Sequence, residues 1–370
     1  MEKFPRKILI VIGTKAELIK CAPLMIELQK QKRNYWFVHT GQHSLKDACE
    51  KFGIKKPDFV LSSAPEISTK FWSKISKNSL LWSFQMIFKI RKVIRKVHPK
   101  YVIYHGDTMS TALSSIASSR LLNMGKRWKN VHLEAGLRSG SLIEPFPEEI
   151  SRIICDKFSD ILLAVSKRTE RNLKKYSGKK VINVGNTIID SAIMVYEKAK
   201  KEGKKHGKEY ALINIHRHEN LRNRERMKKI VKIINSIEIE SFWPLHDNTK
   251  HFLKEYRLLE YIKKNPKITI MPLTDYPSFI FLIANCKYLV TDGGSIQEES
   301  LIFNKPCVIL RNRTERQEGI ETGINFLTKL NADYSARIIN LIENNKLKIK
   351  KFKNPYGEEG VSKKIIEILK

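Results

Sequence analysis

Residues 7–13 read Lys-Ile-Leu-Ile-Val-Ile-Gly, an unbroken apolar run that ends in glycine. A run without polar alternation is typical of a strand that is buried on both faces of a parallel sheet. Residues 15–30 follow it with apolar side chains at helical spacing, among them Leu18, Ala22 and Met25. This strand and helix predict the α/β class, in which helices cover the faces of a parallel sheet.

The same alternation continues along the whole chain of 370 residues. In a first series we expect strands at 35–39, 101–105, 129–133 and 160–165, and helices at 44–52, 79–97, 147–158 and 167–175. In a second series we expect strands at 181–184, 209–215, 240–245, 267–271, 287–291 and 305–310, and helices at 187–201, 223–236, 249–263, 276–285, 294–302, 332–344 and 360–369. The pattern predicts two doubly wound, Rossmann-like domains facing across a cleft, with boundaries at 1–178 and 179–356.

The composition is that of a globular chain, with 42% hydrophobic residues. The most apolar stretch, residues 80–90, is interrupted by polar side chains and is shorter than the ~18 residues of a spanning helix, so we expect no membrane insertion. The first residues lack the layout of a signal peptide, which favours the cytoplasm. The five cysteines form no Cys-x-x-Cys pair, so we expect reduced thiols and no metal site.

The formal net charge of +31 is unusually high. Nucleic-acid binding is one explanation, but the sequence contains no nucleic-acid motif and that hypothesis rests on the charge alone. The lysines are spread along the chain, with clusters at 199–208 and 346–353, which favours a solvated basic surface and no nucleic-acid partner. A field of this sign would also attract an anionic substrate.

Carboxylates follow two predicted strands of the first domain. Asp107 comes just after one strand, and Glu134 follows the next within His-Leu-Glu-Ala-Gly-Leu-Arg-Ser-Gly. Glu148 comes after Pro147 at the start of a helix, and Arg152 lies one turn later. Carboxylates at one sheet edge could supply general acid/base catalysis. The alternatives are a helix cap at Asp107 and a favourable helix-dipole contact at Glu148.

Small residues join a strand to a helix in the second domain. Gly293, Gly294 and Ser295 would let backbone N–H groups approach phosphate oxygens. Glu299, in the helix, could accept hydrogen bonds from ribose hydroxyls, and Arg316 follows the next strand. These residues together favour a nucleotide-phosphate site over the alternative of a plain strand-to-helix turn.

Three further cations occupy the ends of predicted strands or the start of a helix. Lys15 and Lys20 begin the first helix, where the dipole disfavours cations, so they indicate an anionic partner unless they are simply solvated. His216 ends a strand within His-Arg-His. The His-x-His pair could bind a metal, but no third ligand has a suitable spacing, which favours a histidine that faces phosphate.

In this order, the segments resemble the non-hydrolysing UDP-N-acetylglucosamine 2-epimerases, from Gly13 to about Leu327. The motifs that carry the resemblance are His-x-Glu-Ala-Gly-Leu-Arg-Ser-Gly and Pro-Glu-Glu-x-x-Arg within 132–152, Gly-Asn-Thr-Ile-Ile-Asp at 185–190, Asp-Gly-Gly-Ser-Ile-Gln-Glu-Glu at 292–299, Thr-Gly-Gln-His at 40–43 and Glu-Arg-Gln-Glu-Gly at 315–319. The resemblance implies a glycosyltransferase-B-like fold with a C-terminal helix, 357–370, packed on the first domain. It also implies a cytoplasmic homodimer that needs no cofactor and serves polysaccharide biosynthesis.

The resemblance further implies inversion of C2 of UDP-GlcNAc to give UDP-ManNAc, by elimination of UDP and re-addition to a 2-acetamidoglucal. It makes Asp107, Glu134 and Glu148 the acid/base set, and Lys20 and His216 the stabilisers of the departing diphosphate. The substrate contacts that it implies are Lys15, Arg152, Phe279 near uracil, Gly293, Gly294, Ser295, Glu299 at the ribose, and Arg316.

Four features depart from the family pattern. Lys15 stands within Gly-Thr-Lys-Ala-Glu where most relatives have Gly-Thr-Arg-Pro-Glu, Ser295 follows the glycine pair that a serine usually precedes, and His218 replaces a common arginine. The residues after 40–43 also differ, which leaves activation by a second substrate molecule open. A hydrolysing epimerase and an epimerase of a modified UDP-sugar therefore remain alternatives, and a basic nucleic-acid-binding protein is a more distant one.

Overall fold

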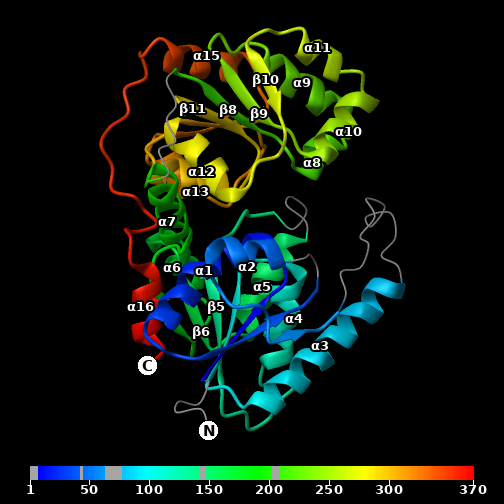
Figure 1. Cartoon of the computed structure of the whole chain (residues 1–370), viewed down its shortest axis with the longest axis vertical. Coiled ribbons are helices and arrows are strands. Elements are labelled where there is room, and N and C mark those ends of the chain that lie inside the picture. Colours follow the sequence, from blue (N-terminus) through cyan, green and yellow to red (C-terminus); the bar gives the residue numbers. More distant parts are fainter. Residues whose placement is uncertain (1–6, 42–44, 63–76, 142–146, 202–207) are drawn as a thin grey trace. The chain divides into compact units, whose positions relative to one another are not determined.

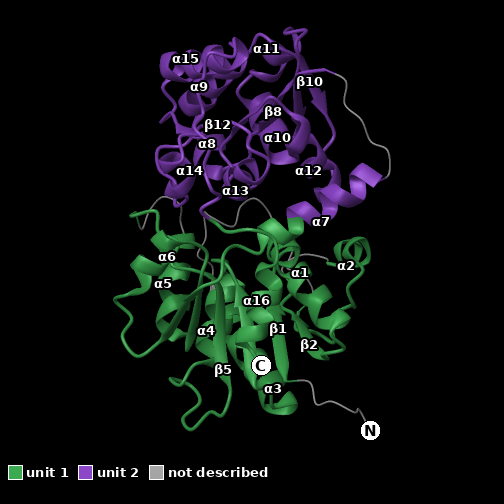
Figure 2. Ribbon diagram, turned by 90° about the vertical axis from the view of Figure 1, so that its left-hand side faces the viewer, with its two compact units in different colours: residues 1–191, 356–370 green, residues 192–355 purple. Residues whose placement is uncertain are grey.

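The computed structural model describes residues 7–41, 45–62, 77–141, 147–201 and 208–370 (Figure 1). The chain divides into two compact units (Figure 2), which we treat separately. Unit 1 comprises residues 1–191 and 356–370, and unit 2 comprises residues 192–355. None of the described helices is long and apolar enough to cross a membrane.

Unit 1 is built on a parallel sheet of seven strands in the order β3-β2-β1-β4-β5-β6-β7. Its strands are β1 (Ile8–Ile12), β2 (Tyr35–His39), β3 (Phe59–Val60), β4 (Tyr101–His105), β5 (Lys129–Ala135), β6 (Ile161–Ala164) and β7 (Lys180–Asn183). Its helices are α1 (Lys15–Lys30), α2 (Lys46–Phe52), α3 (Lys77–Val97), α4 (Met109–Ser118), α5 (Glu148–Phe158), α6 (Lys167–Leu173) and α16 (Val361–Ile368), and α7 (Ile188–Lys201) crosses into unit 2.

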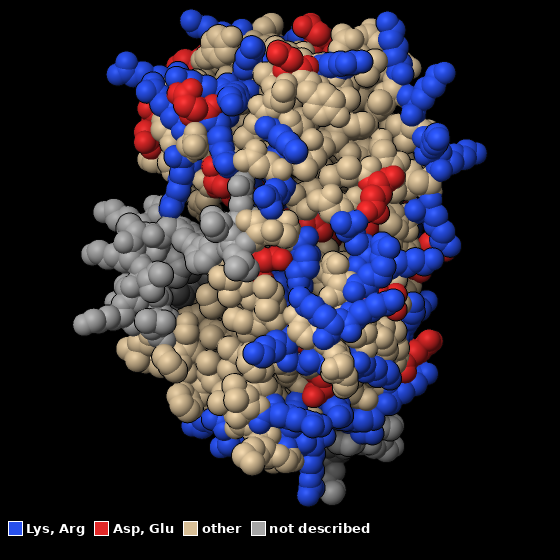
Figure 3. All heavy atoms as spheres, turned by 180° about the vertical axis from the view of Figure 1, so that it is seen from behind, with Lys and Arg blue, Asp and Glu red and all other residues tan. Residues whose placement is uncertain are grey.

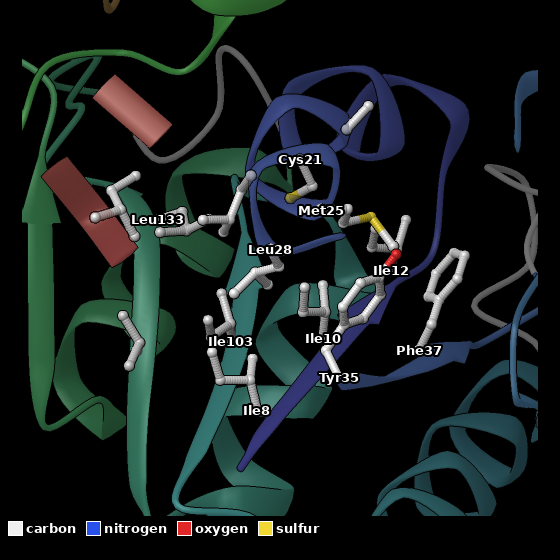
Figure 4. Packing of buried hydrophobic residues seen from close by; sticks show 14 of the residues in the cluster. Ile8, Ile10, Ile12, Cys21, Met25, Leu28, Tyr35, Phe37, Ile103 and Leu133 are labelled. Atoms are coloured by element: carbon white, nitrogen blue, oxygen red, sulfur yellow. The ribbon is translucent and has the colours of Figure 1, made fainter. Parts of the chain in front are cut away.

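The quoted apolar run forms the centre of the unit 1 core. Every residue of β1 is buried. Ile8, Ile10 and Ile12 lie in one cluster with Met25 and Leu28 of α1 (Figure 4). Each fully buried side chain of this size contributes about 1.5–3 kcal/mol through removal of apolar surface from water. Both faces of β1 are covered, which explains why its sequence shows no polar alternation.

The C-terminal helix α16 belongs to unit 1. Val361 and Ile365 lie in the same apolar cluster as β1. The Asp190 carboxylate accepts hydrogen bonds from two backbone N–H groups at the start of α16, at 2.8 and 2.7 Å. The Arg33 guanidinium donates to two carbonyl oxygens of its last turn, both at 3.2 Å. Each end of α16 is therefore held by a side chain of suitable charge for the helix dipole.

Unit 2 repeats the architecture with a parallel sheet of six strands in the order β10-β9-β8-β11-β12-β13. Its strands are β8 (Ala211–Asn214), β9 (Ser241–Pro244), β10 (Ile268–Met271), β11 (Tyr288–Thr291), β12 (Cys307–Ile309) and β13 (Asn325–Leu327). Its helices are α8 (His218–Leu221), α9 (Arg224–Ile234), α10 (Asp247–Glu255), α11 (Leu259–Lys263), α12 (Tyr276–Asn285), α13 (Ser295–Ile302), α14 (Gln317–Glu321) and α15 (Ala332–Glu343).

Both sheets confirm the α/β, Rossmann-like class that the sequence predicts. Several local features differ from the prediction. The segment expected to open the second series forms β7, which pairs with β6 in the first sheet. The expected helix 249–263 is broken near Arg257, whose φ is +60°. No range was expected for α4, although Asp107 was considered as the cap of a helix there, and none was expected for β3, β13, α8 or α14. On the face shown in Figure 3, Lys and Arg side chains are distributed over both units.

Candidate active site

Polar residues of unit 1 gather where the strand order of its sheet reverses. Strands β1 and β4 are neighbours, and the chain continues from them toward opposite edges of the sheet. Ligands of doubly wound sheets bind beyond the carboxyl ends of the strands at such a switch point. Gly13 follows β1, Gly106 follows β4, and Glu134 lies near the end of β5.

Glu134 has a backbone conformation that few residues other than glycine adopt. Its φ is +66°, and the register of β5 against β6 shifts between Leu133 and Ala135. A bulge of this kind redirects a side chain out of the regular alternation of a strand. Left-handed backbone at a non-glycine residue costs about 1–3 kcal/mol and is concentrated at functional sites. Glu134 is therefore a strong candidate for a working residue.

Lys20 is the charge partner of Glu134. Its Nζ donates to Oε2 of Glu134, and the two side chains are only 6% and 5% exposed. His105 Nε2 lies 3.8 Å from the same carboxylate oxygen. Burial lowers the pKa of His105 to about 4, so this histidine is neutral at physiological pH. Lys20 therefore supplies positive charge beside Glu134, and its removal would leave a buried carboxylate poorly compensated.

Arg152 connects Asp107 with Glu149. Its Nη2 donates to Asp107 at 2.5 Å and its Nη1 to Glu149 at 2.9 Å. The Asp107 side chain is 24% exposed, whereas those of Arg152 and Glu149 are 3% and 4% exposed. Asp107 is thus the member of this group that a ligand can reach. The cap of α4 is Thr108, whose hydroxyl accepts from the backbone of the helix, so the helix-cap alternative for Asp107 is wrong.

The two adjacent acids at the start of α5 have different environments. Glu149 accepts from the Ser139 backbone N–H at 3.0 Å and from the Ser139 hydroxyl at 3.2 Å, in addition to Arg152. It anchors the segment that follows β5. Glu148 is partly exposed, so its side chain is more accessible than that of Glu149. This difference supports Glu148, rather than Glu149, as the predicted acid/base residue.

Glu17 joins two loops of the site and was assigned no role from the sequence. One carboxylate oxygen accepts from the backbone N–H groups of Gly13 and Thr14, at 2.6 and 2.9 Å. The other accepts from the hydroxyls of Thr108 and Thr111, at 2.5 and 2.7 Å. Burial raises the pKa of Glu17 above its usual value, and the four hydrogen bonds oppose that rise. Glu17 thereby fixes the turn before Lys15 and Lys20 relative to the segment that carries Asp107.

The histidine and the arginine of the motif that surrounds Glu134 belong to a buried network. His132 contacts the Asp156 carboxylate through Nδ1 at 2.7 Å and the Gly106 carbonyl oxygen through Nε2 at 2.8 Å. Arg138 donates to the other oxygen of Asp156 at 2.6 Å. Although burial opposes ionisation, His132 and Arg138 lower the pKa of Asp156. This network supports the backbone next to Asp107 and Glu134.

In unit 2 the sheet order reverses between β8 and β11, and the glycine pair lies there. Gly293 and Gly294 join β11 to α13. A Cβ on Gly293 would lie 3.1 Å from Cε1 of His216, and a Cβ on Gly294 would lie 2.9 Å from Nη1 of Arg316. Glycine at these positions therefore permits a close approach of the loop to a histidine and an arginine.

Asp292 fixes the loop that carries His216. Its carboxylate accepts from the backbone N–H groups of His216 and Arg217, at 2.9 and 3.1 Å, and from the Asn220 side chain at 3.0 Å. Asp292 is fully buried, and burial raises its pKa while these hydrogen bonds oppose the rise. The His216 side chain itself is 35% exposed, so it is open to a ligand.

The remaining predicted residues of unit 2 lie on α12 and α13. Ser295 is the first residue of α13, and Glu299 is buried within it. Tyr276 begins α12, and burial followed by the charge of Glu299 raises its pKa. Phe279 lies one turn further along α12 and is partly exposed. An aromatic side chain and a ribose-binding candidate therefore lie on neighbouring helices.

Arg316 is buried with two carboxylates. Its Nε lies 3.0 Å from Glu298, and Nη1 contacts Glu315. Its own exposure is 4%. The two acids neutralise the guanidinium and hold it against Gly294. It lies next to the glycine loop, where a contact with the nucleotide is predicted, and its charge is already compensated within unit 2.

Within each unit the structure brings most of the predicted residues together. The unit 1 group is Lys20, Asp107, Glu134 and Arg152, with Glu148 at the start of α5 and exposed Lys15 at the start of α1. The unit 2 group is His216, Gly293, Gly294, Ser295, Glu299 and Arg316, with Phe279 on α12.

Gln42 and His43 of the Thr-Gly-Gln-His motif, and residues 142–146 between the two motifs of 132–152, lie outside the described residues. Across the portion of the chain that the structure describes, no group of three His, Cys, Asp or Glu side chains could hold a metal ion.

Sequence analysis missed the roles of Glu17, Glu149 and Asp292. Only Glu17 had a usable signal, because Thr14-x-x-Glu17 is a capping-box pattern.

Two parallel sheets of Rossmann order, each with polar residues beyond its switch point, define a two-domain α/β protein of the nucleotide-binding type. A lipopolysaccharide outer core galactosyltransferase structure, 12% identical, covers 98% of both chains with a TM-score of 0.56 and supports the glycosyltransferase-B-like fold alone.

The family model for UDP-N-acetylglucosamine 2-epimerase matches residues 26–370. A UDP-N-acetylglucosamine 2-epimerase of Methanococcus maripaludis is 32% identical, over 98% of both chains. The crystal structure of the Methanocaldococcus jannaschii UDP-GlcNAc 2-epimerase in complex with UDP-GlcNAc and UDP is 31% identical, covers 98% of this chain and 99% of its own, and has a TM-score of 0.82. The chain belongs to the UDP-N-acetylglucosamine 2-epimerase family.

Proposed function

We propose that this chain interconverts UDP-GlcNAc and UDP-ManNAc without net hydrolysis. The observation that carries the proposal is the group of buried charges in unit 1, in which Lys20 holds Glu134 and Arg152 holds Asp107. Membership of the epimerase family supports action on UDP-GlcNAc. The absence of net hydrolysis and the ManNAc product are the parts that this proposal adds.

The reaction requires proton transfer at C2 and departure of a diphosphate that gains one negative charge as it leaves. In the first half, a base removes the C2 proton while the C1–O bond breaks, and UDP leaves with the bonding electrons. The product is a 2-acetamidoglucal. In the second half UDP adds back to C1 and a proton is delivered to the opposite face of C2, so no water is consumed. Acid/base groups on both faces of the sugar are therefore needed.

The carboxylates of unit 1 supply that acid/base chemistry. Asp107, Glu134 and Glu148 come from three different segments, so they can act on different faces of one sugar. Asp107 is held at its exposed position by Arg152, and Glu134 by Lys20. Lys20 also places a cation where negative charge develops on the departing diphosphate.

The glycine loop of unit 2 is the proposed site for the nucleotide. Backbone N–H groups at the start of α13 favour phosphate oxygens, and Gly293 lies against His216. Glu299 would accept from the ribose hydroxyls and Phe279 would pack on uracil. The Methanocaldococcus jannaschii enzyme, whose crystal structure is a complex with UDP-GlcNAc and UDP, supports a ligand of this type.

A homodimer is part of the proposal, and α3 offers a surface for it. Leu81, Phe84 and Phe88 are 57%, 61% and 62% exposed. Their spacing places them on one side of the helix. Exposed aromatic stripes of this kind commonly mark a protein interface. The homodimer is expected to form in the cytoplasm, where a polysaccharide precursor would be made.

The proposal is tested by incubating the purified protein with UDP-GlcNAc in D2O and following the products by proton NMR. UDP-ManNAc with deuterium at C2, and no accumulation of free ManNAc, is the expected result. Free ManNAc and UDP would instead identify a hydrolysing epimerase. Turnover of a modified UDP-sugar alone would identify a different substrate, and either outcome would overturn the proposal.

A further inference from the structure

His246 is a second histidine beside His216, and neither the motifs nor the proposed roles include it. It directly precedes α10 in unit 2. The two imidazole rings lie 4.9 Å apart between centroids, with 31° between their planes. Rings at this distance are within the range of aromatic contacts, so each ring packs against the other.

Asn214, at the end of β8, links the two rings by hydrogen bonds. Its Oδ1 lies 2.8 Å from Nδ1 of His216, and its Nδ2 lies 3.5 Å from Nε2 of His246. An amide oxygen can only accept, so His216 must carry a proton on Nδ1. The amide nitrogen can only donate, so His246 presents an unprotonated Nε2. One amide therefore couples the protonation states of both rings.

The surroundings of His216 reinforce this arrangement. Asp292 Oδ1 lies 3.7 Å from Nδ1 of His216, on the same side of the ring as Asn214. A proton on Nδ1 is therefore stabilised by two oxygen atoms. Nε2 then remains as the nitrogen that can meet a ligand, and it can gain a second proton when an anion arrives.

Burial opposes a cation at either ring in the absence of an anion; neighbouring cations add to this at His216, whereas two carboxylates oppose it at His246. Burial, followed by the charges of neighbouring residues, lowers the pKa of His216 below its usual value, and burial also lowers the pKa of His246. The groups that face the pair are Arg217, His218 and Arg311 around His216, and Asp247 and Asp292 around His246.

We infer that His246 is a positioning residue. It stacks on His216 and, through Asn214, holds His216 in the Nδ1-protonated tautomer. Nε2 is then the nitrogen that takes up a proton from solvent when the diphosphate of a nucleotide sugar binds, and it donates a hydrogen bond to a diphosphate oxygen. The inference rests on the proposed function for the identity of the ligand, but its structural part concerns His216 and His246 alone.

Two substitutions of His246 distinguish the contribution of its aromatic ring from that of its acceptor nitrogen. His246→Phe keeps a stacked aromatic ring but loses the acceptor for Asn214. His246→Gln loses the ring but keeps an acceptor oxygen. Because loss of a positioned donor at developing negative charge costs roughly 10²–10³-fold in kcat, we expect kcat to fall at least about 10-fold when His216 is misplaced in His246→Phe. We expect kcat to stay within about 3-fold of wild type in His246→Gln, with KM little changed in both.

His251→Ala is the matched control. His251 lies one turn along α10, and its side chain is 71% exposed. Its replacement should leave kcat and KM unchanged. Thermal melting of all variants, together with titration with UDP, identifies any loss of rate that comes from unfolding of unit 2.

The tautomer itself is measured by two-bond ¹⁵N–¹H correlation spectra of protein labelled with ¹⁵N-histidine, with and without UDP. Without UDP, His216 should carry its proton on Nδ1 in the wild type and in His246→Gln, and should show a mixture of tautomers in His246→Phe. With UDP bound, Nε2 of wild-type His216 should be protonated as well. A wild-type His216 protonated on Nε2 alone would overturn the inference, even if neither variant folded. Equal kcat in His246→Phe and wild type would overturn it as well.

The two proposals fail in different ways. If the wild-type protein turns over no UDP-sugar, the proposed function is wrong, and the tautomer measurement still decides the role of His246. If the protein is an active epimerase and His246→Phe retains both the rate and the tautomer, only the role of His246 is wrong.

Discussion

Replacement of Glu17 should destabilise unit 1 by an amount that follows from its hydrogen bonds. The Glu17 carboxylate is 4% exposed and accepts from two backbone N–H groups and two threonine hydroxyls. In Glu17→Ala the hydroxyls can rotate to other acceptors, but the N–H groups of Gly13 and Thr14 cannot. Each buried donor without an acceptor costs about 1–3 kcal/mol.

The burial penalty of the carboxylate is regained in the variant, so the net loss is smaller than the sum of the lost hydrogen bonds. We expect Glu17→Ala to lower the free energy of unfolding by about 2–5 kcal/mol. For a domain of this size, about 2–4 °C is lost per kcal/mol, so the unit 1 transition should fall by roughly 5–20 °C. Glu17→Gln keeps one acceptor oxygen and should lose less than half as much.

Differential scanning calorimetry measures the transition, and hydrogen exchange of peptides that cover residues 8–20 and 105–112 locates the change. Glu27→Ala is the matched control, because Glu27 lies on the same helix and its carboxylate accepts from the Gln31 side chain at the surface. A Glu17→Ala transition within about 1 °C of wild type, with unchanged exchange, would refute the reasoning, since it would mean that the two loops are held by other contacts.

Four further outcomes are expected. Glu134→Gln and Asp107→Asn should each lower kcat at least about 100-fold while UDP affinity by calorimetry stays within a few-fold; near wild-type turnover in either would exclude its acid/base role. Asp292→Asn places an amide N–H group against a buried donor. It should therefore weaken UDP binding and lower the free energy of unfolding of unit 2 by about 1–3 kcal/mol. Asp333→Asn on the exposed surface should change neither quantity. The pKa of Glu17 is raised in the folded state, so its ionisation costs stability as pH rises above the unfolded value of 4.5. The stability gap between wild type and Glu17→Gln should therefore widen as the pH falls from 7 toward 4.5 in urea titrations, and a constant gap would contradict the assigned shift. Finally, added salt should lower kcat/KM more than kcat, because the net charge of +31 attracts an anionic substrate. Initial rates over a salt series measure both constants, and an equal fall in the two would contradict the expectation.

Sequence patterns were sufficient to predict the strands that are buried on both faces. The runs that became β1, β4 and β8 are continuous apolar segments bounded by glycine or polar residues. Their spacing along the chain predicts parallel strands, and parallel strands place their carboxyl ends at one edge of the sheet. The grouping of acids in unit 1 was therefore predictable as a location, although their partners were not.

Helix α4 shows where local patterns fail. Its sequence is rich in serine and threonine, whose hydroxyls compete with backbone hydrogen bonds and weaken a helix prediction. In the structure the hydroxyls of Ser114 and Ser118 bond to carbonyl oxygens one turn earlier, at 2.7 and 2.8 Å. Burial of these small side chains in unit 1 stabilises a helix that the local sequence does not favour.

The two adjacent glutamates at the start of α5 could not be distinguished from their sequence. Both residues favour the start of a helix in the same way. The fold places Glu149 against Arg152 and Ser139 and leaves Glu148 partly exposed. A one-residue difference turns a side chain by about 100° around a helix of 3.6 residues per turn, and only the position of the neighbouring loop decides which of the two faces it.

The sequence by itself determined the α/β class, the order of most strands and helices, and the residue types that stand beyond the strands. These features depend on which side chains can be buried, and that information is local. The tertiary structure alone decided the left-handed backbone of Glu134, the pairing of Lys20 with Glu134 and of Arg152 with Asp107, and the contact of His216 with His246. These contacts join residues that are distant along the chain, and they form only when packing of the whole sheet fixes where each loop lies.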